Sequence, residues 1–588
     1  MTIVFGTHLR LDRRPRTARF RVAVVTAIFA CLYAIIGVRL VWLGNQNLAT
    51  RAYAAVPPSV ARPDIVDRAG SMLAMDLPSV SVFAEPRRIV DLDEMVEGLV
   101  RVFPDLNMLD LRRRLDSDAA FTWIKRVATP AQKNQLLALG IPGIGFREET
   151  RRIYTNGPTA AHLLGTVNVD NFGIAGIEKW IDNQGLNDLK QSGLQFERGD
   201  LDPITLSIDL RVQHAVTDEL RKAVDRFNAI AGAGLVLDVR NGEVIALVSL
   251  PDFDPNSPGD ALKPDRINRI NVGTYEMGST FKAMTTAMAL DSGAFSIGST
   301  LDASQPLRFG RMTIRDYRGQ NRRLNVPEAF VHSSNISMGR MALGVGTEKH
   351  QAFLRTLGQF DRLTTELPES AQPILPARWA EITTATAAFG HGVAVTPLQA
   401  AMGIAALVNG GDLIRPTLIK GSAVAPRILG RQVVTPQTGE ALRFLMRLNA
   451  EIGSAKKADV EGYFIGGKTG TSEKVIDGRY SSDRVFTAFM GIAPADAPRY
   501  LYLTLLDEPK ALPETFGFRT SGWNAVPVTG GIMRRTLPML MAPYDRRPAN
   551  PFPRMIAAGA WGSERFAPSS DAISSPRIAL SGAVTSNE

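Results

Sequence analysis

The sequence predicts a single transmembrane helix, then an α+β module, then a larger α/β domain built on a mainly antiparallel sheet. An apolar run over residues 20–43 supports the first part. Across 44–205, short strand-like and helical pieces alternate between many prolines and glycines, which indicates the second part. From 206 to 545, strands follow one another with helices between them, as expected for an α/β domain. A chain of 588 residues is too long for one hydrophobic core, so separate folded units are expected.

The N-terminus predicts a membrane anchor with a cytoplasmic arm at 1–19. The net charge is +9, but residues 1–21 hold six arginines and one aspartate, so nucleic acid is not expected as a partner. The run at 20–43 is long enough to cross a bilayer, which takes roughly 20 helical residues. The arginine-rich flank places the N-terminus in the cytoplasm and the remainder outside. A cleaved signal peptide is disfavoured because the small-x-small match at Ala52-Tyr-Ala54 lies well beyond the apolar run.

The rest of the composition is that of a globular protein without a metal or disulfide framework. Hydrophobic residues make up 45% and charged residues 21%. The one cysteine, Cys31, lies inside the predicted span, and the six histidines show no spacing typical of zinc sites. We therefore expect no metal and no cofactor. Residues 546–588 are rich in Pro, Ser, Ala and Arg, which predicts a disordered C-terminal tail.

Local patterns predict individual elements within these units. Helical periodicity occurs at 91–103 and 130–139 in the first module. In the second, the pattern predicts a helix over 209–229 and a hairpin over 234–249, whose turn is an Asn-Gly pair. An Asn-Gly turn between two apolar runs is a strong hairpin signal, so the sheet of the larger domain is expected to be antiparallel here.

Ser279-Thr-Phe-Lys282 is the first of three short motifs that point to chemistry. Gly278 precedes it and an apolar helix-forming run follows, so Ser279 is expected at a helix N-terminus with Lys282 one turn away. A serine hydroxyl needs a base to become a nucleophile, and a lysine can serve only when burial or a second cation keeps it neutral. A second Ser-x-x-Lys match at Ser454 and Lys457 has no ordered partner motifs, and we interpret it as solvated surface.

The second motif is Ser333-Ser-Asn335. On its own, such a tripeptide is most often a helix cap or a loop. Placed after Ser279 and Lys282 in the chain, it supplies two further polar groups for the same site. We predict that Ser333 passes a proton between Lys282 and the leaving amine, and that Asn335 orients Lys282 and the substrate amide.

Lys468-Thr-Gly-Thr471 is the third motif. Lys468 would be the second cation, and together with the hydroxyls of Thr469 and Thr471 it would hold a substrate carboxylate. Gly470 would let a substrate backbone lie against this strand. The backbone N–H groups of Thr471 and Ser279 would form the oxyanion hole.

A phosphate-binding loop is a competing interpretation, because residues 462–469 fit the pattern Gly-x-x-x-x-Gly-Lys-Ser/Thr in full. That motif needs a strand before the loop and a helix that opens at the lysine. Here residues 463–465, inside the supposed loop, predict a strand, and the glycines after Lys468 favour a hairpin. A nucleotide site is therefore disfavoured.

The three motifs in this order resemble the signature of serine β-lactamases and penicillin-binding proteins. Ser334 stands where the β-lactamase example has Asp, which resembles the high-molecular-mass transpeptidases. Residues 275–282 resemble the Glu-Pro-Gly-Ser-Thr-Phe-Lys segment of that group, with Met277 in place of proline. Further stretches resemble boxes of the class B pedestal (dimerisation-type) module, namely 62–70, 160–165 and 173–178. The chain thus resembles the class B penicillin-binding proteins.

This resemblance implies a pedestal at 44–205 and a β-lactamase-like transpeptidase domain at 206–545. Its implied activity is that of a serine-type peptidoglycan D,D-transpeptidase. Ser279 would attack the D-Ala–D-Ala bond of a stem pentapeptide, and the acyl group would pass to an amino group on a neighbouring stem. β-Lactam antibiotics would trap Ser279. The resemblance also implies a single-pass inner-membrane protein with a periplasmic catalytic domain.

Within class B, the features favour the division-specific branch, which is FtsI-like or of the penicillin-binding protein 3 type. They are the short pedestal, Arg39 at the far end of the span, and residues 522–527 near the domain end. An FtsW-type glycosyltransferase and other divisome membrane proteins would then be partners. The alternatives are an elongation-specific transpeptidase, a D,D-carboxypeptidase or β-lactamase-type hydrolase, and an inactive sensor. An inactive sensor is disfavoured because every motif position is intact.

Overall fold

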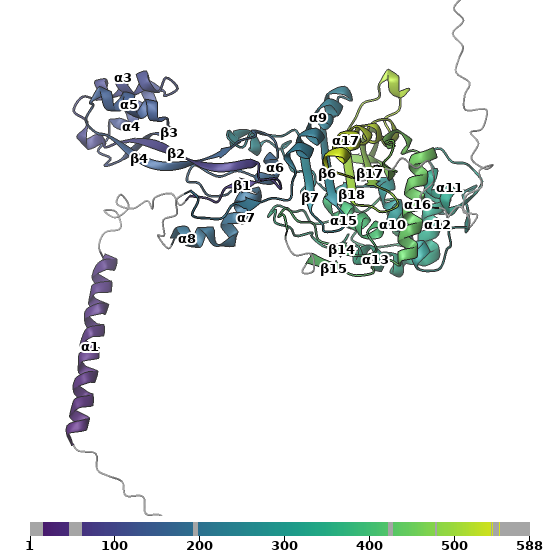
Figure 1. The fold of residues 1–588 in the computed structure, drawn as a ribbon, viewed down its shortest axis with the longest axis horizontal. Coiled ribbons are helices and arrows are strands. Elements are labelled where there is room, and N and C mark those ends of the chain that lie inside the picture. Colours follow the sequence, from purple (N-terminus) through teal and green to yellow (C-terminus); the bar gives the residue numbers. More distant parts are fainter. Residues whose placement is uncertain are drawn as a thin grey trace, which may run out of the picture. The chain divides into compact units, whose positions relative to one another are not determined.

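A computed structural model gives the fold of the chain (Figure 1). It describes residues 16–45, 61–191, 198–421, 427–476, 479–542, 544 and 552. The predicted tail at 546–588, apart from Phe552, and residues 1–15 of the predicted arm lie outside the described residues. Helix α1 (Arg16–Asn45) covers the segment predicted as the anchor. Among the described residues, no helix is both long enough and apolar enough to cross a membrane.

Two compact units make up the chain. The smaller consists of Met1–Val60, Pro78–Glu149 and Gly193–Gln195. The larger consists of Ala61–Leu77, Thr150–Ser192 and Phe196–Glu588. The domain boundaries that the sequence suggested at 44, 206 and 545 stay predictions.

The smaller unit packs three helices around strand segments. The helices predicted at 91–103 and 130–139 are present. The first begins at Asp91, whose carboxylate accepts hydrogen bonds from the backbone N–H groups of Asp93 and Glu94 and so caps the helix. Leu99 is fully buried in the apolar core of this unit. Its elements are β2 (Met72–Ala84), α3 (Leu92–Val102), α4 (Met108–Leu115), β3 (Thr122–Ala128), α5 (Pro130–Leu139) and β4 (Ile144–Tyr154), and β2 and β4 continue into the larger unit.

The N-terminal segments of the larger unit form short elements. Strand β1 (Ile65–Val66) pairs with the first part of β2 in an antiparallel manner and with β5 (Ile204–Thr205) in a parallel manner. The short helices α6 (Ala161–Leu164), α7 (Gly176–Ile181) and α8 (Asn187–Gln191) follow β4. Several charged side chains from this region are buried and are discussed below.

An antiparallel sheet of five strands forms the centre of the larger unit, in the order β16-β17-β18-β6-β7. The predicted antiparallel sheet and the hairpin predicted at 234–249 are therefore confirmed. Gly242 in the hairpin turn has φ +75°, a conformation that glycine adopts without strain. The strands are β6 (Ala231–Asp238), β7 (Val244–Leu250), β16 (Gly466–Ile476), β17 (Arg479–Ala493) and β18 (Tyr500–Asp507).

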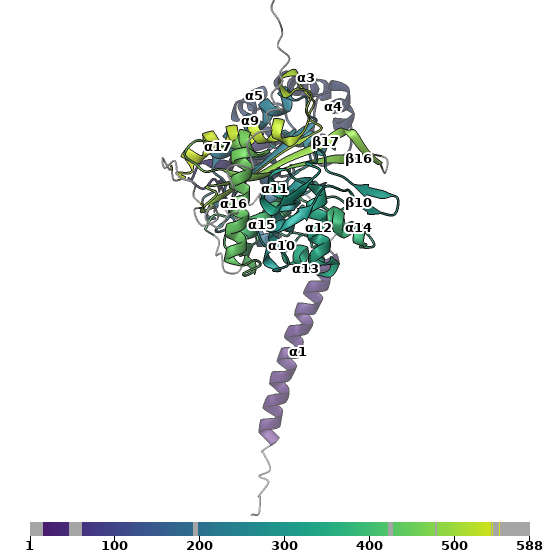
Figure 2. The same ribbon diagram turned by 90° about the vertical axis from the view of Figure 1, so that its right-hand side faces the viewer.

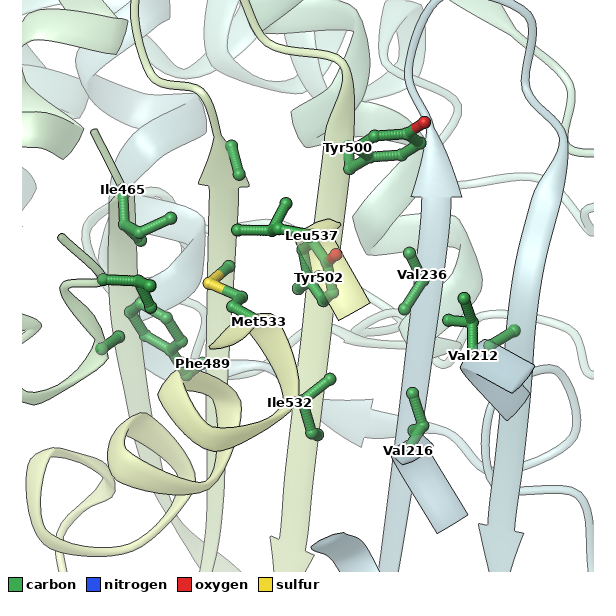
Figure 3. Close-up of a cluster of buried hydrophobic side chains, with 14 of the residues drawn as sticks. Val212, Val216, Val236, Ile465, Phe489, Tyr500, Tyr502, Ile532, Met533 and Leu537 are labelled. Carbon is green, nitrogen blue, oxygen red and sulfur yellow. The ribbon is translucent and has the colours of Figure 1, made fainter. Parts of the chain in front are cut away.

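Helices α9 (Leu210–Arg226) and α17 (Ala525–Met539) lie together on one side of this sheet (Figure 2). Val216 from α9 and Met533 from α17 pack with Tyr502 of β18 in one buried cluster (Figure 3). Full burial of one large apolar side chain contributes about 1.5–3 kcal/mol to the free energy of folding, so this cluster stabilises the packing of the two helices on the sheet. The Tyr502 hydroxyl is satisfied by the hydroxyl of Thr536 at 2.9 Å.

A group of helices lies on the other side of strands β16 and β17 (Figure 2). Two of the three motifs lie at the starts of these helices, and the third lies on β16, at one end of the sheet order. The helices are α10 (Lys282–Asp291), α11 (Val326–Val331), α12 (Asn335–Val345), α13 (Thr347–Thr356) and α15 (Pro397–Val408), with α16 (Pro436–Ile452) beside them. The fold thus brings the motifs together where helices meet an edge strand.

Candidate active site

Ser279 lies in a 3-10 turn, η4 (Gly278–Phe281), that runs directly into α10. The backbone N–H of Lys282 donates to the carbonyl of Ser279, so the two residues are one turn apart as predicted. Gly278 opens the turn with φ +53°. The side chain of Ser279 is half-buried, whereas Lys282 is fully buried. Local geometry therefore holds the serine and the lysine at one end of the same helix.

The backbone of strand β16 packs closely against the backbone of this turn. A Cβ atom added to Gly278 would lie 3.0 Å from the carbonyl oxygen of Thr471. A Cβ added to Gly470 would lie 2.6 Å from the carbonyl oxygen of Met277. Side chains larger than glycine would push the strand and the turn apart. The two glycines thus keep the backbones of Ser279 and Thr471 next to each other.

The hydroxyl of Ser333 lies between two lysines. It accepts a hydrogen bond from Lys282 Nζ at 3.0 Å and another from Lys468 Nζ at 2.9 Å. Lys282 Nζ also donates to the backbone carbonyl of Ser333. Both lysines are 0% exposed. One residue from each of the three motifs therefore meets at a single oxygen atom.

Burial sets the charge state of this centre. It lowers the pKa of Lys282 well below its ordinary value, the charge of Lys468 lowers it further, and Asp316 acts in the opposite direction. Burial also lowers the pKa of Lys468 to about 7. Both effects follow from the cost of placing a charge in a buried site of low dielectric constant. The arrangement favours the neutral form of Lys282, which is the form that can accept a proton.

The remaining residues of the second motif begin helix α12. Ser334 is the N-cap, and its hydroxyl accepts from the backbone N–H of Ser337 at 3.0 Å. Ser333, just before it, has φ +56°, an uncommon conformation for a residue other than glycine. Asn335 donates from Nδ2 to the carbonyl of Arg315 at 3.1 Å. The predicted role of Asn335 in orienting Lys282 and the substrate stays a prediction.

The third motif lies within β16, and its hydroxyls have partners from two other segments. Thr469 Oγ1 lies 2.8 Å from Ser454 Oγ. Thr471 Oγ1 accepts from the backbone N–H of Ser521 at 3.1 Å. Because Lys468 lies inside a strand and not at the start of a helix, a phosphate-binding loop is excluded at this position.

One expectation about this segment was wrong. The pattern at 463–465 predicted a strand, but β16 begins at Gly466. Phe464 instead has φ +44°, and its carbonyl accepts from the backbone N–H of Ala495 at 2.8 Å. A contact with a distant turn therefore overrides the local preference of these aromatic and β-branched residues for a strand.

Sequence reasoning missed three residues at this site, namely Asp316, Ser454 and Ser521. Ser454 was interpreted as solvated surface; it is exposed, yet it bonds to Thr469. Asp316 lies in a loop that belongs to no motif. Only the folded chain brings these groups to the motifs, so no local pattern could have identified them.

Comparisons with known proteins show the family to which the chain belongs. Residues 232–528 match the penicillin binding protein transpeptidase domain, and residues 57–197 match the penicillin-binding protein dimerisation domain. The chain is 40% identical over 546 residues to the probable peptidoglycan D,D-transpeptidase FtsI of Caulobacter vibrioides, covering 90% of each chain. The chain belongs to the class B penicillin-binding proteins. As a class B penicillin-binding protein it is a serine-type peptidoglycan D,D-transpeptidase, and the resemblance found in the sequence is confirmed.

Two further proteins are similar to this chain. The peptidoglycan D,D-transpeptidase FtsI of Escherichia coli is 31% identical over 503 residues, which cover 81% of this chain and 83% of that protein. The crystal structure of penicillin-binding protein 3 from Mycobacterium tuberculosis, complexed with aztreonam, matches with a TM-score of 0.63 at 23% identity. That match covers 83% of this chain and 98% of the other, and it shows that the two proteins share a fold.

Proposed function

We propose that this class B penicillin-binding protein cross-links peptidoglycan at the division septum through an acyl-enzyme on Ser279. The observation that carries the proposal is the Ser333 hydroxyl between two buried lysines, one of which lies a single turn from Ser279. The likeness to FtsI proteins of two organisms supports the septal role.

In the acylation step, neutral Lys282 takes the proton of the Ser279 hydroxyl as its oxygen attacks the carbonyl carbon of the penultimate D-Ala. The negative charge that develops on the carbonyl oxygen faces the backbone N–H groups of Ser279 and Thr471. The C–N bond then breaks, and Ser333 relays the proton from Lys282 to the departing amine. The terminal D-Ala leaves, and an ester joins the donor peptide to Ser279.

The third motif holds the donor peptide. Lys468, with the hydroxyls of Thr469 and Thr471, binds the terminal carboxylate of the D-Ala–D-Ala unit. An opposite charge next to Lys468 favours its protonated form, so substrate binding keeps this lysine charged. The substrate backbone lies along β16, the last strand in the sheet order, where it can add as a further strand past Gly470. Asn335 binds the substrate amide.

In the second half of the reaction an amino group on a neighbouring stem peptide attacks the ester. Lys282 takes a proton from this amine and returns it to the Ser279 oxygen as the new amide bond forms. β-Lactams follow the first step only, since their acyl group stays attached to Ser279. These steps use groups of the chain itself and need no metal or cofactor.

We infer that residues 20–43 anchor the protein in the inner membrane as a single pass. Large apolar side chains along α1, among them Val25, Ile28 and Leu32, are exposed, which is costly in water and favourable in lipid. The arginines before them would keep the N-terminus in the cytoplasm and the catalytic domain in the periplasm.

The proposed partners follow from the same topology. The two matched domains supply cross-linking and a pedestal, so an FtsW-type glycosyltransferase and other divisome membrane proteins would provide polymerisation and location. A fluorescent fusion expressed at native level tests the septal role. We expect accumulation at midcell during constriction, whereas a uniform signal along the sidewall would indicate an elongation-specific transpeptidase instead.

Intact mass spectrometry tests the catalytic proposal. The full chain in detergent is incubated with benzylpenicillin, and the adduct is mapped by peptide digestion. We expect one long-lived acyl adduct on the peptide that contains Ser279, and none in Ser279→Ala. An adduct on another serine would overturn the assignment, and rapid release of hydrolysed penicillin would identify a β-lactamase-type hydrolase.

A further inference from the structure

Asp316 contacts the second motif although it belongs to none of the three motifs. It follows strand β11 (Met312–Ile314), which forms a short hairpin with β10 (Leu307–Phe309). One carboxylate oxygen accepts from the hydroxyl of Ser334 at 2.7 Å, and the other accepts from the backbone N–H of Ile336 at 2.9 Å. Asp316 thus binds the residue directly after Ser333 and the first turn of α12.

These contacts complete the start of α12. The first N–H groups of a helix have no partner within the helix and need one from elsewhere. Here Ser334 accepts from the N–H of Ser337, and Asp316 accepts from that of Ile336. A carboxylate is also the favoured charge at a helix N-terminus. The neighbouring carbonyl of Arg315 accepts from Asn335, so the same loop holds the second and third residues of the motif.

The negative charge of Asp316 also acts on Lys282. The ionisable groups that act on Lys282 from the elements packed around it are Lys468 on β16 and Asp316 after β11. Lys468 opposes a positive charge on Lys282, and Asp316 favours one. The carboxylate therefore limits how far the neighbouring cation and burial reduce the basicity of Lys282.

We propose that Asp316 is a positioning residue for proton transfer, which fixes Ser333 between the two lysines through its hydrogen bonds to Ser334 and to the first turn of α12. The signature of the β-lactamases has Asp at the middle position of the second motif. In this chain that position is Ser334, and Asp316 brings a carboxylate to it from a separate loop. Serine plus a distant aspartate takes the place of a single aspartate.

This inference rests on the proposed function, and the experiment separates the two. Acylation rates with a fluorescent penicillin are measured on the full chain in detergent, with Ser279→Ala as the test of the proposed function. Asp316→Ala should lower the rate by about a hundredfold, the order expected when a reacting group is displaced by roughly 1 Å. Asp260→Asn, an exposed carboxylate paired only with nearby Lys263 in the ion pairs of the described chain, is the matched control and should leave the rate unchanged.

Asp316→Asn separates charge from shape because it is isosteric. Loss of the negative charge should make Lys282 less basic, so the acidic limb of the acylation rate profile should move to lower pH. A residue that only supports the fold would lower the rate at every pH without moving that limb. Melting temperatures of all variants show whether a loss of rate reflects unfolding.

A second test moves the carboxylate from position 316 to position 334 and measures the acylation rate. Ser334→Asp alone places two carboxylates together and should lower the rate by about tenfold or more, as like charges repel. Ser334→Asp combined with Asp316→Asn restores a single carboxylate at the helix start and should recover most of the activity. An Asp316→Asn profile identical to the wild type, or a double variant no better than the worse single variant, would overturn the proposal even with an intact Ser279 adduct.

Discussion

Two clusters of buried charge in the larger unit differ in the partners available to their charges. In the pedestal segments, Arg62 donates to Glu178 at 2.7 Å and to Asp182 at 2.6 Å. Arg152 donates to Glu178 at 2.6 Å and to Asp76 at 3.1 Å. Every member of this network is almost completely buried. Two cations thus share three anions, and each guanidinium also reaches a backbone carbonyl.

In the active site, by contrast, Lys282 and Lys468 point at one neutral hydroxyl, that of Ser333. The consequences for ionisation are opposite. Burial alone would raise the pKa of Glu178, but Arg152 and Arg62 outweigh it and lower that pKa. The pKa of Lys282 is lowered by burial and lowered again by a like charge. Buried charge with partners stays ionised and supports the fold, whereas buried charge beside a like charge becomes a base.

Lys282→Met tests the second half of this comparison and should have the largest effect. Removal of the base should lower acylation of Ser279 by about 10³-fold or more, near the upper end of general-base effects. Methionine replaces a buried amine for which a charge is unfavourable, so the fold should not be destabilised and the melting temperature should stay the same or rise. Acylation kinetics and thermal unfolding of the same preparation check both points.

A large drop in melting temperature for Lys282→Met would contradict the comparison, because it would mean that the lysine pair is structural. Lys282→Arg is the matched variant. Its guanidinium stays charged and cannot accept the proton, so activity should be lost here too, even though a cation is kept.

Glu178→Gln tests the first half. The substitution keeps the shape but leaves Arg62 and Arg152 short of a buried anion. Breaking a buried ion pair from one side costs about 3–5 kcal/mol, so we expect a strong loss of unfolding free energy. Denaturant unfolding measures it, and the acylation rate of the molecules that remain folded should not change.

Glu97→Gln is the control for that experiment. Glu97 is exposed on α3, and exposed substitutions usually change stability by less than about 0.5 kcal/mol. Equal losses for the two variants would mean that the buried network adds nothing beyond an ordinary surface charge.

The pH dependence of acylation sharpens the contrast between the two lysines. Lys468 must be charged to bind a carboxylate, and burial lowers its pKa to about 7. The second-order rate constant with benzylpenicillin should therefore fall as the pH rises above about 7, by roughly tenfold for each pH unit. In Lys468→Arg the guanidinium stays charged, so this alkaline limb should disappear even if the overall rate is lower. An unchanged alkaline limb in that variant would assign the titration to another group.

The sequence could predict those features of the site that local geometry controls. Ser279 and Lys282 are one helical turn apart, and an Asn-Gly turn determines the β6–β7 hairpin, so short patterns sufficed for both. The order of the three motifs then indicated the family. Nothing local could show that Ser333 would meet both lysines, which lie 51 and 135 residues away in the chain.

The residues that sequence reasoning missed or misplaced depend on tertiary contacts. Asp316 acts through a loop whose sequence carries no motif, and the strand predicted at 463–465 is displaced by the conformation of Phe464. Ser454 is instructive because it did match Ser-x-x-Lys. Its tertiary surroundings place its hydroxyl beside Thr469 of the third motif. The Ser-x-x-Lys pattern alone would have suggested a nucleophile.

Ser454→Ala should have the smallest effect of the changes that are expected to alter acylation. It removes the hydroxyl that lies 2.8 Å from Thr469 Oγ1, and Thr469 is one of the groups proposed to hold the substrate carboxylate. A single neutral hydrogen bond contributes about 1 kcal/mol, so acylation should slow by roughly fivefold. Ser296→Ala removes an exposed hydroxyl that bonds only to Ser299 among the described residues, and it should have no effect. If both variants matched the wild type, the hydroxyl of Thr469 would orient itself without help, and Ser454 would be the surface serine that its sequence context suggested.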